Sequence, residues 1–499
     1  MNRRDFVQKP INSPASSGTY YEAVVPDTLD LAERAGLGLN HFLGIIREEA
    51  KYNYEMPFRV GYRYPSILLM ALVGLPCTQP KAMEAMAFLR LMTGSTEGLG
   101  LEAKMMEMMV STQGADGLFW VPGATDETAW REIPEPFAYL HGQGRMLRAM
   151  IAWHQYTGDP AWEARIDRLV EGLNKMAVHK EDYAYFPVHG HYGGSASYQN
   201  SCYTRKGWRD SVEPTDEKAG EEGSLFNHQG HMPGALATWY QLTGNEEALR
   251  LSGKLVRFLT KPKFWADWQK GGYPGVVGAE HAHWRGHFHG HLNTLRAILE
   301  YALATNDSRL KDFVRDGYEW MRQMGFARIG FFDPQGCGTG RVIGLAVKLT
   351  KAGIGDYWED VDQYIRNYGI EAQVVPEDME YVRQAAKAAG FDLNEEQERL
   401  LEKMVGGFNH IPIKHEVLLC CSPHGNMGLF YAWEGMLGYD RGVAQINLLL
   451  NRASPWVDID SYLPYEGKVV LRNKTAREAF VRMPLWVDRK AVRCTRGNT

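Results

Sequence analysis

HGQGRMLRAMIAWHQYTG, residues 141–158, is the stretch that decides the fold, because the chain repeats its pattern twice. Residues 227–244 read NHQGHMPGALATWYQLTG, and residues 289–306 read HGHLNTLRAILEYALATN. Every copy has alanine in its ninth place and threonine in its seventeenth, and Gly or Asn follows that threonine. Apolar residues three and four apart predict a helix in each copy, and the Gly or Asn supplies a left-handed stop.

A second amphipathic segment follows each copy, so the repeated unit is predicted to be a helical hairpin. These segments are residues 162–176, 246–259 and 308–324, and the earlier segments 29–47 and 80–92 fit the same pattern. Hairpins that cannot bury their apolar faces alone must stack or close into a ring. We therefore predict a mainly α fold, an (α/α)6 toroid or barrel, in which the first helices line the inside and their polar starts meet at one mouth.

The pattern changes after about residue 440, where short apolar or alternating runs replace the helical period. The runs are residues 443–450, 457–465, 467–472 and 479–483. Such runs with turns between them are typical of antiparallel β-structure. We predict a catalytic (α/α)6 barrel domain over residues 1–440, followed by a short antiparallel β-segment over residues 441–499 that resembles the start of a β-sandwich.

Composition excludes several classes of protein. The net charge is -5, and the 55 basic and 60 acidic residues are mixed without a basic stripe, so we expect no nucleic-acid partner. Nothing approaches the roughly 18 apolar residues that a membrane helix needs. The basic start, MNRRDF, has no apolar segment after it, so we expect no functional export signal and a cytoplasmic protein, with a trimmed signal left open. Six cysteines in 499 residues are too sparse for a disulfide framework.

The segment CCSPHGN, residues 420–426, carries the most specific chemistry. It places Cys420 and Cys421 at the expected N-terminus of a helix, where the helix dipole favours thiolate. Thiolates bind zinc, and Cys337 in DPQGCGTGR offers a third. A zinc-bound cysteine could also act as a nucleophile. The alternative is that these cysteines are buried and pack as small apolar residues.

Polar residues at the starts of the repeated helices are candidates for binding a sugar through hydrogen bonds. They are His141, Gln143, His228, Gln229, His231, His289 and His291. Glutamine is a poor metal ligand, which favours substrate binding over a metal site at this recurring position. The alternative is that neighbouring backbone groups satisfy these side chains. No pair of carboxylates stands out for acid–base work among Glu221, Glu222, Glu280, Glu319 and Glu416.

These residues resemble glycoside hydrolase family 127, the β-L-arabinofuranosidase-like enzymes, over about residues 130–490. The strongest likeness is CCSPHGN followed by a helix and then INLLLNRAS. The resemblance implies an (α/α)6 barrel with a β-sandwich, a zinc ion held by three cysteines and a glutamate, and a cysteine nucleophile. It implies that Cys420 is nucleophile and zinc ligand, that Cys337 and Cys421 are ligands, and that His231 and His291 bind sugar.

The sequence departs from that family in two places. Gln335 stands where the metal-binding glutamate belongs, and the loop that carries the acid–base glutamate is missing between Trp320 and Gln335. We predict a glycoside hydrolase acting on a small glycoside or oligosaccharide, with zinc as the expected cofactor and carbohydrate as the partner; a homo-oligomer is left open. The alternatives are a sugar epimerase or polysaccharide lyase that uses His and Tyr, and a non-catalytic sugar-binding relative.

Overall fold

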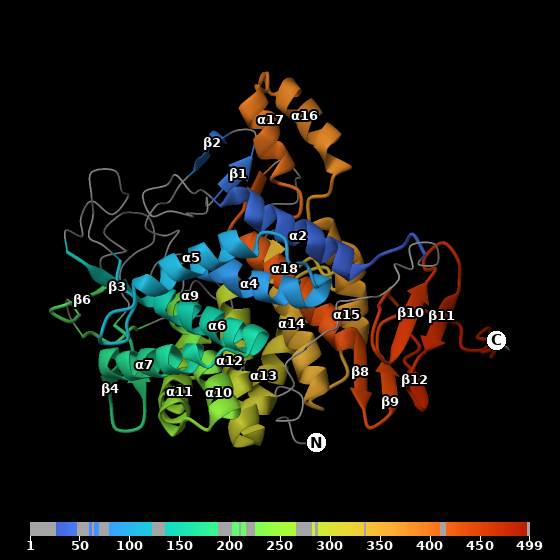
Figure 1. The fold of residues 1–499 in the computed structure, drawn as a ribbon. Helices are drawn as coiled ribbons and strands as arrows, with labels where there is room; N and C mark the ends of the chain where they lie inside the picture. Colours follow the sequence, from blue (N-terminus) through green and yellow to red (C-terminus); the bar gives the residue numbers. More distant parts are fainter. Residues whose placement is uncertain are drawn as a thin grey trace.

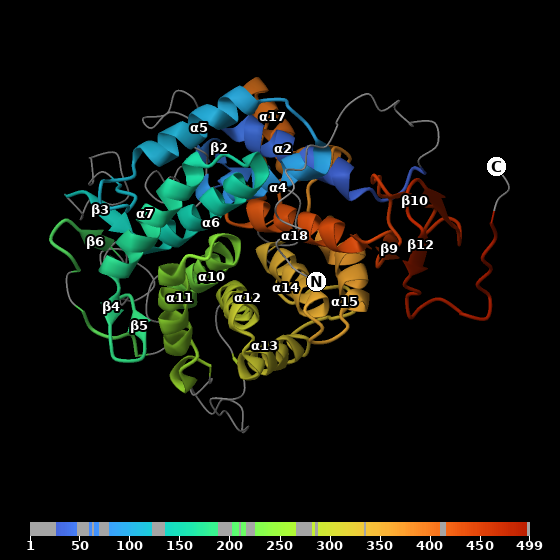
Figure 2. The same ribbon diagram turned by 60° about the horizontal axis from the view of Figure 1, so that its bottom comes forward.

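Six of the described helices form a closed inner ring in the computed structural model. The structure describes residues 26–46, 59–61, 64–68, 79–121, 135–187, 202–208, 211–215, 225–265, 282–284, 288–333, 336–409 and 416–496. The ring consists, in order, of α4 (Gln79–Thr93), α6 (Leu140–Thr157), α10 (Met232–Thr243), α12 (Phe288–Thr305), α14 (Gly336–Lys351) and α18 (Cys421–Met436). Each helix packs against the next, and α18 packs against α4 (Figures 1 and 2).

An outer layer of helices surrounds this ring. The chain runs outward after each inner helix into α5 (Leu99–Ser111), α7 (Ala161–Met176), α11 (Glu246–Leu259), α13 (Ser308–Met321) and α15 (Trp358–Tyr364). The outer partner of α18 comes from the other end of the chain, because α2 (Leu31–Ile45) packs against both α18 and α4. Six inner and six outer helices confirm the predicted mainly α, (α/α)6 toroid.

The repeated helices end as their sequences predict. Gly158, Gly244 and Asn306 follow α6, α10 and α12, and all three have positive φ angles, of 68°, 80° and 55°. The threonine before each of them donates its hydroxyl to the carbonyl four residues earlier. The repeat therefore encodes the stop of an inner helix, after which the chain turns outward.

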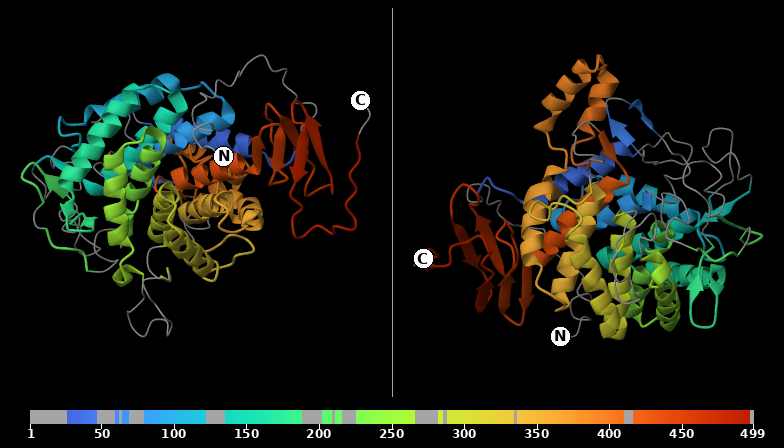
Figure 3. Two further views of the ribbon diagram at one scale, coloured as in Figure 1. Left: turned by 90° about the horizontal axis from the view of Figure 1, so that it is seen from below. Right: turned by 180° about the vertical axis from the view of Figure 1, so that it is seen from behind.

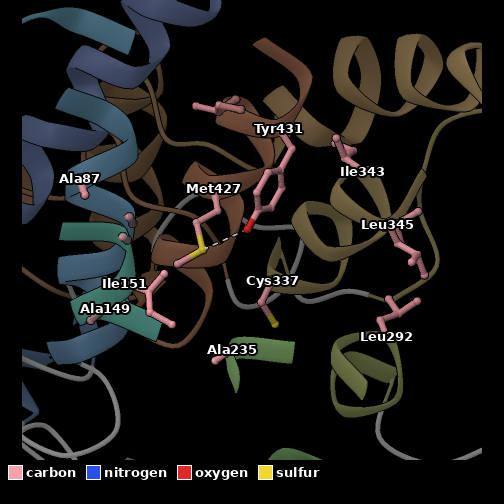
Figure 4. Close-up of a cluster of buried hydrophobic side chains, with 14 of the residues drawn as sticks. Ala87, Ala149, Ile151, Ala235, Leu292, Cys337, Ile343, Leu345, Met427 and Tyr431 are labelled. Atoms are coloured by element: carbon pink, nitrogen blue, oxygen red, sulfur yellow. Dashed lines mark hydrogen bonds between the residues drawn. The ribbon is translucent and has the colours of Figure 1, made fainter. Parts of the chain in front are cut away.

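Glycines let α14 and α18 approach closely. A Cβ on Gly340 would lie 1.9 Å from the carbonyl oxygen of His424, and a Cβ on Gly428 would lie 2.7 Å from the Cα of Gly340. Since real Cβ atoms do not come so near to backbone, only glycine fits at these contacts. The close approach brings the N-terminal ends of the two helices together. Cys337, at the start of α14, belongs to the same buried cluster as Met427 of α18 (Figure 4).

Two helices project from the ring as an arm, α16 (Asp378–Ala388) and α17 (Glu395–Glu402), at the top of Figure 1. A small antiparallel sheet lies beside α17, with β1 (Arg59–Gly61) between β2 (Tyr64–Leu68) and β7 (Glu416–Leu418). The remaining short elements are β3 (Phe137–Tyr139), β4 (Val178–His179), β5 (Ala184–Tyr185), β6 (Cys202–Thr204), α9 (Leu225–Gln229), η3 (Pro262–Phe264) and η4 (Ile365–Gly369).

The C-terminal strands lie on one side of the ring, as both views of Figure 3 show. They are β8 (Leu437–Asp440), β9 (Val443–Ile446), β10 (Val457–Ser461), β11 (Val469–Asn473) and β12 (Glu478–Val481). β8 pairs with β9, and β10 with β11, in the antiparallel sense that the sequence predicts. β12 differs, because it adds to β9 in parallel. The strands begin where α18 ends, and the proposed division into two domains stays a prediction.

None of the described helices combines the length and the apolar character that crossing a membrane requires.

Candidate functional site

The N-terminal ends of the inner helices meet, as the sequence predicts, and bring polar side chains together from around the ring. Lys81 of α4 contacts Cys420 at the start of α18. The rings of His141 on α6 and His231 before α10 stack 5.3 Å apart, and that of His289 on α12 lies 4.7 Å from that of His424 on α18. The site is therefore built from the first turns of helices that are far apart in the sequence.

The three thiols that the sequence singles out form one cluster. Cys337, Cys420 and Cys421 are hydrogen-bonded to one another. Cys337 and Cys421 are buried, whereas Cys420 keeps some exposure. Hydrogen bonds from the other two thiols, and then the charge of Lys81, hold the pKa of Cys420 well below its usual value, while the pKa values of Cys337 and Cys421 are raised. One thiolate supported by two thiols is the state that this cluster favours.

Lys81 is a functional residue that sequence reasoning missed. The residue is 1% exposed, and its Nζ donates to Cys420 Sγ across 3.5 Å. The signal for it is a lysine within the mostly apolar start of a predicted helix, KAMEAMAF, whose other charged residue is Glu84. A buried ammonium stabilises a neighbouring thiolate through charge, and the thiolate in turn compensates the cost of burying the ammonium.

The described residues do not by themselves fit the zinc site that the family resemblance implies. Within the described ranges, no group of three or more His, Cys, Asp or Glu side chains is arranged to hold a metal ion. The donor set here is three sulfurs with the Lys81 cation against one of them, and a cation in that place opposes a dication. Gln335, which replaces the expected glutamate, lies outside the described residues.

Two guanidinium groups and one imidazole form a second layer, one helical turn further along the inner helices, and His141 of the first layer contacts it. Arg145 Nη1 and Arg341 Nη2 both donate to His424 Nε2, at 3.2 and 3.1 Å. Arg145 Nε also donates to His141 Nε2 at 3.1 Å. All four residues are buried. The sequence gives no sign of this layer, because these residues are far apart in the chain and come close in space only when the ring closes.

Two histidines of the site, His231 and His424, favour their neutral form. Burial, followed by the positive charge of Arg145, lowers the pKa of His231 well below its usual value. Burial, followed by the charge of Arg341, does the same for His424. Because two guanidinium groups donate to His424 Nε2, its proton belongs on Nδ1. Neutral imidazoles can accept as well as donate hydrogen bonds, as a sugar hydroxyl requires.

The recurring glutamines use their amides on the backbone. Gln143 accepts from the N–H of Phe119 at 2.9 Å and donates to its carbonyl at 2.8 Å. Gln229 makes the same pair of bonds with Phe186, at 3.3 and 2.7 Å. Both amides already have partners, so the substrate-binding role predicted for them stays a prediction.

His291, the third member of the recurring position, packs in an aromatic box. Its ring stacks on Trp284 with centroids 4.5 Å apart and meets the edges of Phe226 and Trp265. The side chain of His228 lies outside the described residues. Its predicted role, like that of His291, is untested by the structure.

The carboxylates proposed for acid–base work are dispersed. Glu319 lies on the outer helix α13 and bonds to Tyr357 and Arg322. Glu221, Glu222, Glu280 and the side chain of Glu416 lie outside the described residues. Asp333 is a carboxylate that sequence reasoning missed: its Cβ lies 3.4 Å from the place a Cβ on Gly338 would take, and its charge acts on Tyr368 together with those of Cys337 and Cys421.

Comparison with known proteins bears on the fold. A family 127 β-arabinofuranosidase structure superposes with a TM-score of 0.53 at 11% identity, covering 91% of this chain and 67% of that one. The chain has the fold of a family 127 glycoside hydrolase. The resemblance seen in the sequence is thus confirmed at the level of the family 127 fold. No family model and no curated protein matches the sequence.

Two further solved structures are similar to the chain. A family 127 β-L-arabinofuranosidase from Geobacillus stearothermophilus T6 has a TM-score of 0.46 at 15% identity and covers 89% of this chain and 67% of that one. An unsaturated glucuronyl hydrolase specific for heparin has a TM-score of 0.49 at 12% identity, with 81% and 97% covered.

Proposed function

We propose that the chain is a glycoside hydrolase that uses Cys420 as its nucleophile. The observation that carries the proposal is Cys420, a partly exposed residue at the mouth of the toroid, where hydrogen bonds from two thiols and the charge of Lys81 lower the pKa of its thiol. A structure with a similar fold is a β-arabinofuranosidase, which supports a glycoside as substrate.

The proposed reaction has two displacements. The Cys420 thiolate attacks the anomeric carbon, so that a C–S bond forms while the bond to the leaving oxygen breaks, and a carboxylic acid protonates that oxygen. Water then attacks the same carbon, the carboxylate takes its proton, and the thiolate leaves. We infer that Asp333 supplies the carboxyl group, because its Cβ approaches Gly338, the neighbour of Cys337, and because it acts on Tyr368 together with Cys337 and Cys421. The outcome is retention at the anomeric carbon.

Replacing the nucleophile tests this proposal. Cys420→Ala is expected to lower kcat on a cleaved aryl glycoside by about a thousandfold or more, since no thioglycoside can form. Mass spectrometry of the quenched wild type should show one glycosyl unit on the peptide that holds Cys420. Cys494→Ala is the matched control, because Cys494 is an exposed thiol outside the ring and should keep full activity. Full activity of Cys420→Ala would refute the proposal.

Zinc is the second interpretation of the thiol cluster. In that case Cys337, Cys420 and Cys421 would hold the ion, which would keep Cys420 ionised. Metal analysis of the purified chain separates the two: one zinc per chain, lost in Cys337→Ser, supports the metal site, and a chain that cleaves glycosides without zinc supports Lys81.

A lyase or epimerase is the second candidate function, and one observation favours it. The rings of His141 and His231 stack beside Arg145, and the lowered pKa of His231 leaves it a neutral imidazole that could remove a proton next to a carboxylate or carbonyl. Product analysis decides, because a lyase yields an unsaturated sugar that absorbs in the ultraviolet and an epimerase releases no new hydroxyl from water. The third alternative, a non-catalytic sugar-binding protein, would bind without turnover.

A further inference from the structure

The second layer of the site carries more positive charge than its described carboxylates balance. Arg145, Arg148 and Arg341 lie close enough that each of the first two lowers the pKa of Arg341, after burial itself. The carboxylate that acts on this group is Glu84, and it already binds Arg148 through two oxygens, at 3.0 and 2.5 Å. Glu84 is therefore committed to one guanidinium.

Arg341 is the residue with unmet bonding capacity. It is 2% exposed, and its single described hydrogen bond runs from Nη2 to His424. Its Nε and Nη1 have no hydrogen-bond partner within the ranges that the structure describes. A buried guanidinium without an anion is costly, and its planar fork matches the two oxygens of a carboxylate or sulfate.

The depth of this group relative to the nucleophile is fixed by helix geometry. Arg341 follows Cys337 by four residues, Arg145 follows His141 by four, and His424 follows Cys420 by four. Residues four apart lie on one face of a helix, one turn or about 5.4 Å apart. Both guanidinium groups therefore lie one turn deeper in the toroid than the thiols, a separation comparable to the width of a sugar ring.

We propose that Arg341 and Arg145 bind an acidic group of the substrate, so that the sugar attacked by Cys420 carries a carboxylate or a sulfate ester on the side of the ring opposite its anomeric carbon. The inference rests on the proposed function in one respect, because it assumes that the acidic group is part of the glycoside that Cys420 attacks. Neutral sugars would leave the buried Arg341 without a counterion, so the site selects for charge.

Binding of matched sugar pairs tests the proposal. Calorimetry would compare methyl glucuronide with methyl glucoside, and N-acetylglucosamine 6-sulfate with N-acetylglucosamine, on the full chain. In at least one pair the acidic member should bind at least about tenfold more tightly, and the pair that shows this distinguishes carboxylate from sulfate. Equal affinities within both pairs would overturn the inference, as would inorganic sulfate that binds as tightly as the sugar acids.

The variant Arg341→Gln shows whether this residue is responsible. It should weaken binding of the acidic member by about 10- to 100-fold and leave the neutral member unchanged, because a charge-assisted bidentate bond is lost. Arg366→Gln is the control, since Arg366 pairs with Asp362 on the outer layer. Retained charge selectivity in Arg341→Gln would overturn the inference.

Thermal unfolding of the unliganded variants shows whether a loss of binding comes from misfolding. Arg341→Gln should melt at or above the wild-type temperature, because the substitution removes a buried charge that lacks bonds. A lower melting temperature would show that Arg341 has a structural partner and would overturn its role as an anion ligand. If the acidic sugars bind selectively but Cys420→Ala leaves their hydrolysis intact, the proposed nucleophile fails while the anion site stands.

Discussion

At the scale of single residues, the site depends on how a thiolate is kept in a dry environment. Burial raises the pKa of a thiol, and in this chain two thiol hydrogen bonds and the Lys81 ammonium reverse that effect at Cys420. The two thiol hydrogen bonds contribute most to this effect, and the charge of Lys81 adds to it. Charge placed by α4 therefore helps to keep a cysteine on α18 in its reactive form.

Replacing this lysine should separate charge from packing. We expect Lys81→Met, which keeps the length of the side chain, to lower kcat by about 10- to 100-fold with little change in KM, because a buried charge next to the nucleophile is lost. Lys81→Arg should recover part of the loss. Steady-state kinetics on a cleaved aryl glycoside would measure both, and a Lys81→Met enzyme with wild-type kcat would contradict the assigned role.

At the scale of elements, the repeated sequence encodes how an inner helix is attached to the segment before it. Gln143 and Gln229, in the same place of their repeats, each make a two-bond bridge to one backbone residue, Phe119 or Phe186. These bridges satisfy buried backbone groups outside regular ladders. At these two glutamines the recurring position joins consecutive hairpins, and the sugar binding predicted for it stays a prediction.

This structural role leads to a stability prediction. Gln143→Ala should lower the free energy of unfolding by about 3 kcal/mol, because the N–H and C=O of Phe119 both lose a buried partner. Gln155→Ala, at an exposed position of the same helix, should change it by less than about 0.5 kcal/mol. Chemical denaturation measures both, and equal stabilities of the two variants would argue against the bridge.

What the sequence predicts depends on whether a feature is local. The helix stops at Gly158 and Gly244 follow from their own residues, and so does the thiol pair at the start of α18. Two sets of contacts arise only when the ring closes. Lys81 then meets Cys420, and His424 accepts from both Arg145 and Arg341. The parallel pairing of β12 with β9 is likewise long-range, since an isolated strand pattern does not set the direction of its neighbour.

At the scale of the whole molecule, the toroid is closed by joining its two ends. α2 packs its apolar stripe, which includes Leu39 and Phe42, against α4 and α18, the first and last helices of the ring. The projecting α16 and α17 are placed differently, because α17, which carries the buried Leu401, packs against β1 and β2 at the edge of the ring. The ring helices should therefore unfold together in one cooperative transition, and α16 and α17 should be able to unfold locally.

Two buried large-to-small substitutions test this difference. Phe42 and Leu401 are both fully buried, but only Phe42 lies where α2 joins the two ends of the ring. Phe42→Ala should therefore lower the free energy of unfolding of the entire ring by about 3 to 5 kcal/mol and shift its single unfolding transition. Leu401→Ala should leave that transition nearly in place and increase amide hydrogen exchange within residues 378–402 alone, because local opening reports local stability. A Phe42→Ala protein with faster amide exchange confined to α2 would show that the ring stays closed without this helix. In that case the contact between α4 and α18 alone would hold Cys420 next to Lys81.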